Sequence, residues 1–332
     1  MKIKVVLAAI IALASVVSWA AAQDTVRVVY IPKNTGNPYF DSIIGGFEQA
    51  AEELGFEFTT VAPAQAGATD QIPFINAQIQ RGVDVIAISP NSADALNRVF
   101  DRARERGIKV IIVNSDIPGS EEHRDVAVLP VDFTTIGPSQ MELLGSLIDY
   151  EGQFAILSAT TDAPDQNVWI ADMQRVHEED PRFGNMELVR IAYGDDDPQK
   201  SLVEAEALLS SFPNLRGIIS PTTVGVAAAA QAVETAGRAP QVQVIGLGTP
   251  NQMRRFIHNE TVEAFQLWSP YNQGYLAGYL SVGMVNGTIE AEPGNTFEVP
   301  GLGEIEFGDM NVVLTQAVPT NFDSSNIDDF DF

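Results

Sequence analysis

The side chains best suited to chemistry are polar and aromatic groups at the ends of predicted strands and in the segments that follow them. Lys33 can donate up to three hydrogen bonds, and Asp165 accepts strongly from hydroxyl groups. Aromatic faces such as those of Phe40 and Trp268 cover C–H surfaces. This combination suits the capture of a small polyhydroxylated molecule. The candidate binding residues are Lys33, Asn34, Phe40, Asn114, Asp116, Asp165, Gln166, Pro221, Thr222, Thr223, Gly248, Trp268 and Gln273.

Several of these candidates also have a purely structural explanation. Lys33 could be a solvated loop residue, and Asp165 could cap the helix that follows it, a role that does not prevent ligand binding. Phe40 and Trp268 could be ordinary core side chains. Trp169, one turn into its helix, is expected in the core or in the wall of the pocket.

Patterns typical of catalytic and metal sites are absent from the sequence. The three histidines, His123, His177 and His258, have no metal-ligand spacing, and there is no cysteine. No nucleophile elbow, P-loop or dinucleotide-binding glycine motif is present. The acidic run 195–197 lacks the spacing of a calcium loop and favours a solvated cap of a helix starting near Pro198. The sequence therefore predicts neither enzyme activity nor a metal or other cofactor.

Length, hydrophobic content and charge limit the class of protein. The 332 residues suit two domains, and 45% of them are hydrophobic, which is enough for a substantial core. The formal net charge of −25 repels phosphate backbones and anionic lipids. Nucleic acids and membrane surfaces are therefore not expected as partners.

The N-terminus has the pattern of a signal peptide. Lysines precede an apolar run over 5–17, and the alanines at 20–22 supply the small residues of a cleavage site. Cleavage before Gln23 would remove residues 1–22 and would leave no cysteine for a lipid anchor. We therefore expect a periplasmic protein that is not inserted in the membrane.

Strands and helices alternate along the rest of the chain, which predicts doubly wound parallel sheets. The first half contains strands over 26–31, 56–61, 83–88 and 109–113, with helices over 40–54, 69–81 and 92–106. After a change near 129–135 come strands over 152–158, 187–193, 217–220, 243–247 and 261–268, with helices over 166–179, 200–212, 224–236, 251–258 and 272–285. The predicted fold is α/β, with two doubly wound parallel-sheet domains joined by a multi-segment hinge. Ligands of such sheets bind beyond the carboxyl ends of the strands.

Each of the two expected lobes is built from discontinuous segments. The N-terminal lobe comprises 23–131 plus about 271–296, and the C-terminal lobe comprises 132–270 plus about 297–332. The expected crossings lie near 131–132, near 269–270 and between 286 and 300. Closure of this hinge on a ligand that contacts both lobes is the expected mechanism.

The whole chain after residue 22 resembles the ribose-binding-protein class of periplasmic sugar-binding proteins. Asn37-Pro38-Tyr39-Phe40, followed by a helix, is similar to the first ligand loop of that class. The resemblance implies the periplasmic binding protein type I fold. It also implies a monomer that delivers a small sugar to the permease of an ABC importer.

Two subfamilies of this class are similar to the chain in different segments. Rhamnose-importer binding proteins are similar over 152–160, 193–196, 221–225 and 246–248, and autoinducer-2-binding proteins over 31–33, 165–167, 249–251 and 326–328. The autoinducer-2 pattern implies ligand contacts by Lys33, Asp165, Gln166 and Pro221.

Both patterns also have departures in this chain. Asn114 replaces an aspartate of the autoinducer-2 pattern, and Thr223 replaces an alanine. Thr222 and Thr223 fit the rhamnose-type pattern, in which Asp165 replaces an asparagine. The sequence favours a rhamnose-type monosaccharide, with autoinducer-2 as the alternative ligand.

Two other classes of function share this fold. A sensor protein that presents its ligand to a chemoreceptor or a kinase fits the same features and stays open as an alternative. The effector domain of a transcriptional repressor would need a DNA-binding helix-turn-helix and a cytoplasmic address. The predicted export signal and the acidity argue against that last class.

Overall fold

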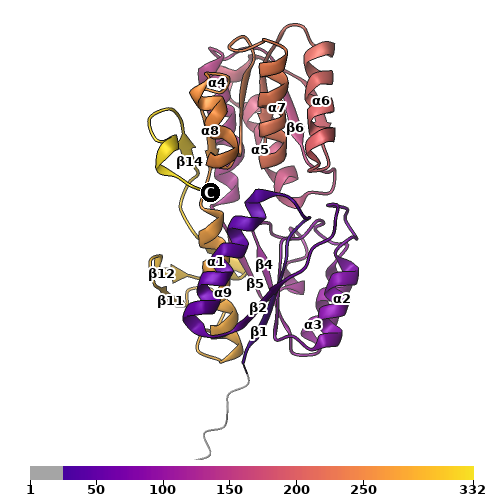
Figure 1. Cartoon of the computed structure of the whole chain (residues 1–332), viewed down its shortest axis with the longest axis vertical. Coiled ribbons are helices and arrows are strands. Elements are labelled where there is room, and N and C mark those ends of the chain that lie inside the picture. Colours follow the sequence, from indigo (N-terminus) through magenta and orange to yellow (C-terminus); the bar gives the residue numbers. More distant parts are fainter. Residues whose placement is uncertain (1–24) are drawn as a thin grey trace, which may run out of the picture.

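The computed structural model describes residues 25–332, which form two lobes stacked along the long axis of the molecule (Figure 1). The first lobe holds a six-stranded parallel sheet in the order β13 (Val312–Leu314), β5 (Val126–Leu129), β4 (Lys109–Val113), β3 (Val85–Ile88), β1 (Arg27–Ile31) and β2 (Glu57–Thr60). The second holds a four-stranded parallel sheet in the order β7 (Asn185–Tyr193), β6 (Glu151–Ser158), β8 (Leu215–Ser220) and β9 (Gln243–Gly246). The predicted fold class is confirmed. The predicted signal peptide, 1–22, lies outside the described residues.

Helices accompany both sheets. Those of the first lobe are α1 (Pro38–Leu54), α2 (Ile72–Arg81), α3 (Asn97–Arg104) and α9 (Pro270–Val285). Those of the second are α4 (Ile136–Leu147), α5 (Pro164–Glu179), α6 (Pro198–Ser211), α7 (Thr223–Thr235) and α8 (Pro250–His258). In the first sheet, Val28 and Tyr30 pack with α1 and α9, whereas Val29 and Ile31 pack with α2 and α3. Burial on both faces explains why these strands are continuous apolar runs.

Local signals set the bounds of α1. The Asn37 side chain accepts a hydrogen bond from the Tyr39 amide at 3.1 Å, and Pro38 follows the cap. The helix ends at Gly55, whose φ of 73° is in the left-handed region. Because α1 starts directly after the loop that follows β1, its first turn lies at the carboxyl end of the sheet.

Strand β5 and helix α4 have no counterpart among the predicted elements. β5 is only four residues long, and α4 contains Gly137 and Gly145, which lower helix propensity. Tertiary packing holds α4 in place instead. A Cβ atom on Gly137 would lie 2.7 Å from the Trp169 carbonyl oxygen, so α4 lies directly against α5.

Two predicted elements are shorter in the structure. The helix predicted over 92–106 starts only at Asn97, because Ser92 Oγ accepts from the amides of Asp94 and Ala95 at 3.4 and 3.2 Å and forms a turn. The strand predicted over 261–268 is reduced to β10 (Phe265–Leu267), which pairs antiparallel with β14 (Thr320–Phe322).

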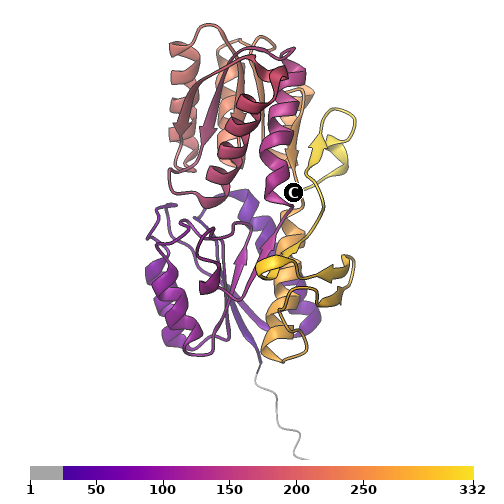
Figure 2. The same ribbon diagram turned by 180° about the vertical axis from the view of Figure 1, so that it is seen from behind.

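The C-terminal tail runs along one side of the molecule and joins both lobes (Figure 2). After the hairpin of β11 (Thr296–Val299) and β12 (Gly303–Glu306), β13 pairs in parallel with β5, and β14 then pairs with β10. The expectation that 297–332 lies wholly with the C-terminal lobe is therefore wrong, because the β13 backbone extends the first sheet. The tail passes from the first lobe to the second between β13 and β14, and not between 286 and 300 as expected.

Candidate ligand-binding site

A cleft with about 350 Å³ of space, part of it open to solvent, lies between the lobes, where loops follow the carboxyl ends of the strands. The predicted residues that line it are Lys33, Phe40, Asn114, Asp165, Gln166, Pro221, Thr222, Thr223 and Trp268. Further lining residues, which were not among the candidates, are Asn37, Tyr39, Trp169, Asp196, Leu247 and Leu267. The cleft therefore combines charged, amide, hydroxyl and aromatic groups.

An ion pair joins the two lobes across this cleft. Both carboxylate oxygens of Asp165 accept from Lys33 Nζ at 2.8 Å. The Lys33 side chain is only 6% exposed and that of Asp165 only 3%. Because α5 starts at Pro164, Asp165 stands in its first turn, where the helix dipole favours a carboxylate. Lys33 is therefore not the solvated loop residue of the alternative explanation.

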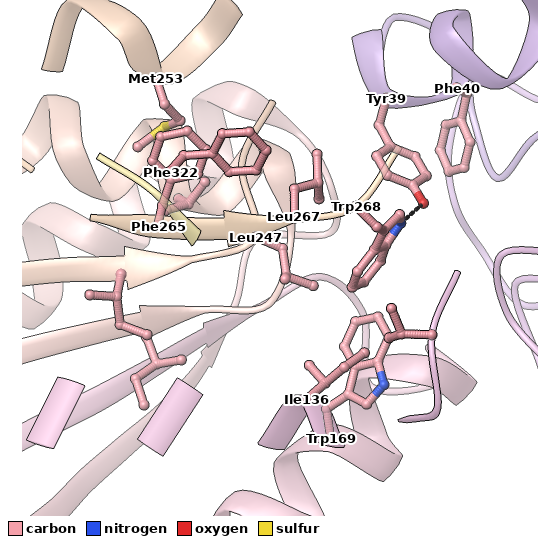
Figure 3. Packing of buried hydrophobic residues seen from close by; sticks show 14 of the residues in the cluster. Tyr39, Phe40, Ile136, Trp169, Leu247, Met253, Phe265, Leu267, Trp268 and Phe322 are labelled. Atoms are coloured by element: carbon pink, nitrogen blue, oxygen red, sulfur yellow. Dashed lines mark hydrogen bonds between the residues drawn. The ribbon is translucent and has the colours of Figure 1, made fainter. Parts of the chain in front are cut away.

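Tyr39 is a hydrogen-bonding centre within the cleft. Its hydroxyl donates to Asn114 Oδ1 at 2.5 Å. The same hydroxyl accepts from Trp268 Nε1 at 2.6 Å (Figure 3). It also accepts from Gln273 Nε2 at 2.8 Å. Burial raises the pKa of Tyr39 well above its usual range, so the hydroxyl stays protonated. Tyr39 thereby ties α1 to the loop after β4, to the end of β10 and to α9.

Two indole rings form the aromatic wall of the cleft. The rings of Trp169 and Trp268 are 5.9 Å apart between centroids and inclined by 66° (Figure 3). Phe133 packs edge-on against Trp169 from the first crossing segment, at 5.2 Å. Among the described residues, Trp169 Nε1 is buried without a hydrogen-bond partner. Trp169 therefore supplies both a ring face and an uncommitted donor.

Threonines at the start of α7 complete the polar lining. Thr223 Oγ1 donates to Asn37 Oδ1 at 3.1 Å, a second bond that spans the cleft. Thr222 Oγ1 donates to the carboxylate of Asp196, a residue that is only 6% exposed. Burial raises the pKa of Asp196 above its ordinary value.

The acidic run 195–197 has two different roles. Asp197 accepts from the Lys200 amide at 2.7 Å and caps α6, as expected. Asp196 instead turns into the cleft with a φ of 53°, in the left-handed region. The interpretation of the whole run as a solvated cap is therefore wrong for Asp196, because the backbone reverses direction at that residue.

Replacing Asp196 by asparagine is expected to change how stability depends on pH. Burial raises the pKa of Asp196 in the folded protein above its value in the unfolded chain. Between these two pKa values, the folded wild type binds a proton that the unfolded chain does not. The free energy of unfolding of the wild type therefore rises as the pH falls through the raised pKa. Asp196→Asn removes this rise and stabilises the protein at neutral pH. Urea unfolding between about pH 4 and pH 7 tests this expectation. A difference between variant and wild type that does not change with pH would contradict it.

Two candidate residues, Asp116 and Gly248, are not among the residues that line the cleft. Asp116 pairs with Arg124 through two contacts of 2.6 Å within the first lobe. Gly248 packs inside the second lobe, where a Cβ atom would lie 2.6 Å from the Met253 side chain. Both residues thus have partners within their own lobes, and their contact with a ligand stays a prediction.

Three other candidates have indirect or divided roles. Gln273 is fully buried and is not among the lining residues, but it donates to Tyr39. Asn34 donates to the Asp196 carbonyl oxygen at 3.5 Å and faces an adjoining hollow. Gln166 lines the cleft, although its Oε1 already accepts from two donors at the end of β6, at 2.7 and 2.8 Å. Only its amide nitrogen remains for a ligand.

Within residues 25–332, no group of three or more His, Cys, Asp or Glu side chains is placed to hold a metal ion. Over the same residues, no helix is long and apolar enough to cross a membrane.

Two α/β lobes with a polar and aromatic cleft between them form an arrangement suited to holding a small molecule. A family model described as periplasmic binding protein domain matches residues 28–289. The chain belongs to this periplasmic binding protein family, whose members are solute-binding proteins and not enzymes.

Three solved structures illustrate the relationship. A sugar ABC transporter protein from Actinomyces odontolyticus is 37% identical, with a TM-score of 0.73 over 92% of this chain and 98% of its own. An ABC transporter solute-binding protein from Clostridium phytofermentas with bound L-rhamnose is 34% identical, with a TM-score of 0.87 over the same shares. LsrB from Clostridium saccharobutylicum in complex with AI-2 is 23% identical, with a TM-score of 0.85 over 92% and 100%. This last likeness concerns the fold alone.

Proposed function

We propose that the protein binds a monosaccharide, L-rhamnose or a close relative, and delivers it to the permease of an ABC importer. The observation that carries this proposal is the cleft itself, where buried polar groups from both lobes face a pair of indole rings. Hydroxyl groups need such donors and acceptors, and sugar C–H faces suit aromatic rings. Two similar structures support this proposal: one is described as a sugar ABC transporter, and the other is a solute-binding protein with bound L-rhamnose.

The apolar part of the lining favours a deoxy sugar. Leu247 and Leu267 line the cleft beside the polar groups, as does Phe40. A hydroxyl placed against such side chains would lose its hydrogen bonds, whereas the methyl group of a 6-deoxy sugar gains from burial there. Export through the predicted signal peptide and action as a monomer belong to the same proposal.

Autoinducer-2 is the second candidate ligand. Lys33, Asp165, Gln166 and Pro221, which match its pattern, all line the cleft. Asn114 and Thr223 depart from that pattern, and both already bond within the protein, to Tyr39 and Asn37. The rhamnose-type ligand is therefore the first choice.

A thermal-shift panel of L-rhamnose, other common monosaccharides and autoinducer-2 tests the proposal. A ligand at a hundredfold excess over its dissociation constant adds about 2.7 kcal/mol to stability, which shifts the melting temperature visibly. A shift with L-rhamnose or a related sugar is expected. A shift with autoinducer-2 alone would replace the first candidate by the second, and no shift at all would refute both.

Trp169→Phe is expected to weaken ligand binding and to cost less stability than the same change at Trp268. Because Trp169 Nε1 has no partner among the described residues, its loss breaks no bond within the protein. A ligand hydroxyl that accepts from it would lose about 1 kcal/mol, or about fivefold in affinity. Isothermal titration and thermal unfolding measure the two effects.

Trp268→Phe is the matched control for this prediction. It removes the bond of 2.6 Å from Trp268 Nε1 to Tyr39. This variant is therefore expected to lose more stability than Trp169→Phe, as well as affinity. If Trp169→Phe binds the ligand as tightly as the wild type does, the indole nitrogen of Trp169 does not contact the ligand.

A further inference from the structure

A second hollow adjoins the cleft at the waist of the molecule. This outer chamber is lined by Asn34, Thr35, 64–68, 160–162, 195–198 and Lys200. Its empty space is about 1200 Å³, part of it open to solvent, compared with about 350 Å³ for the cleft. Asp196 lines both spaces and therefore lies between them. Loops of the two lobes meet at the waist on the side away from the C-terminal tail (Figure 1).

Both lobes contribute walls to the outer chamber. Thr35 and 64–68 follow β1 and β2 of the first sheet, while 160–162 and 195–198 follow β6 and β7 of the second. These are the carboxyl ends at which ligands of open α/β sheets bind. A molecule that occupies the cleft and extends past Asp196 would enter this chamber and contact both lobes.

The charges in the outer chamber are largely satisfied within the protein. Lys200 Nζ pairs with the Asp195 carboxylate, and Asp197 accepts from the Lys200 amide. Asp196 accepts from a threonine hydroxyl. Among the lining carboxylates of the described chain, this leaves Asp162 without a hydrogen bond or ion pair. Together with the chamber's threonine hydroxyls, this favours a neutral ligand rich in hydroxyl groups over a strongly charged one.

Asn34 lines this chamber, and its side chain holds an unused acceptor. The residue is 6% exposed, and its Nδ2 donates to the Asp196 carbonyl oxygen across the waist at 3.5 Å. Its Oδ1 is buried and, within residues 25–332, has no hydrogen-bond partner. A buried acceptor without a donor costs free energy. A ligand hydroxyl that donates to Asn34 Oδ1 would remove this cost.

Small side chains keep the chamber open on the side of the first lobe. The segment 64–68 reads Ala-Gln-Ala-Gly-Ala, and all five residues line the chamber. Ala64 is exposed, so a large side chain there would project into free space without disturbing the core. This position offers a way to fill the chamber while leaving the cleft unchanged.

We propose that the outer chamber binds a second sugar unit, so that the ligand is a disaccharide or glycoside whose terminal monosaccharide occupies the cleft. The inference rests on the proposed function and extends it from a single monosaccharide to a longer molecule. Asn34 Oδ1 and the Asp162 carboxylate accept from hydroxyl groups of the second unit. The linkage between the two units passes beside Asp196, which borders both spaces.

Calorimetric titration with L-rhamnose and with three α-L-rhamnosyl-D-glucoses, linked 1→2, 1→4 and 1→6, tests this inference. At least one disaccharide is expected to bind about tenfold more tightly than L-rhamnose. In Ala64→Trp that gain is lost, while the affinity for L-rhamnose stays within about twofold. Ala171→Trp, at an exposed position of α5 outside the chamber, is the matched control and keeps the gain.

The outcomes separate the inference from the proposed function. If L-rhamnose binds and no disaccharide binds more tightly, or if Ala64→Trp leaves the gain intact, the outer chamber is not a sugar site. If the thermal-shift panel selects another monosaccharide, the disaccharides carry that unit at the non-reducing end. If no sugar binds at all, the proposed function fails and the inference fails with it.

Discussion

Replacing Asp165 by alanine is expected to raise the dissociation constant of the ligand at least about 100-fold. The thermal stability of the ligand-free protein should change little. The reason is that Asp165 and Lys33 come from different lobes and meet only across the closed cleft, with both oxygens 2.8 Å from Lys33 Nζ. The cost of the substitution therefore falls on closure and not on the folding of either lobe.

The size of this effect follows from the burial of the ion pair. With the lobes closed, Lys33 is 6% exposed, so loss of its partner would leave a buried, unpaired ammonium group. Removing one member of such a pair costs about 3–5 kcal/mol. In an open form, water would hydrate Lys33 and this cost would not arise. Since only the closed form contacts a ligand from both sides, the penalty appears as lost affinity.

A second buried ion pair provides the control. Arg124, whose side chain is 1% exposed, bonds Asp116 through two contacts of 2.6 Å, and both residues belong to the first lobe. Asp116→Ala should lower the free energy of unfolding by about 3–5 kcal/mol and leave ligand affinity unchanged. Calorimetric titration and urea unfolding of both variants measure the contrast. If Asp165→Ala loses stability rather than affinity, the pair does not control closure.

Strand ends were a dependable guide to the ligand cleft. Lys33, Asn114 and Thr222 were predicted because each follows an apolar run that ends abruptly, and all three line the cleft. The rule works because a buried parallel strand is recognisable from local sequence and because all such strands end on one side of their sheet.

Backbone direction beyond the strand end could not be predicted in the same way. Asn114 has a φ of 74°, in the left-handed region, and lines the cleft. Asp116, two residues on, points instead to Arg124. Which of two neighbouring polar residues lines the cleft depends on one backbone angle and on a partner from elsewhere in the lobe. The same holds for Asp196, with a φ of 53°.

The spacing of apolar residues also does not predict contacts between helices that are far apart in the sequence. The apolar face predicted for 40–54 includes Ile43 and Phe47, and both are buried. Nothing in that pattern shows that Gly46 touches a helix more than 220 residues later. A Cβ atom on Gly46 would lie 2.0 Å from the Tyr271 carbonyl oxygen, and one on Gly274 would lie 1.9 Å from that of Ile43. Helices α1 and α9 therefore meet backbone to backbone.

This close approach positions the binding site. Tyr39 stands in the first turn of α1, and Gln273 stands in the first turn of α9 beside Gly274. Their hydrogen bond of 2.8 Å requires the two helices to keep their present separation. A methyl group at Gly46 would push the helices apart, because backbone atoms cannot rotate out of its way as a side chain could.

Gly46→Ala is therefore expected to lower the free energy of unfolding by about 3 kcal/mol and to weaken ligand binding through Tyr39. Gly45→Ala is the matched control on the same helix, because its Cβ atom would lie 3.8 Å from the Tyr271 ring, an ordinary contact. That variant should gain up to about 1 kcal/mol, since alanine is the better helix former. Urea unfolding and calorimetric titration measure both variants. Similar stabilities in the two would mean that α1 and α9 can separate without loss, and that glycine at 46 is not required for the site.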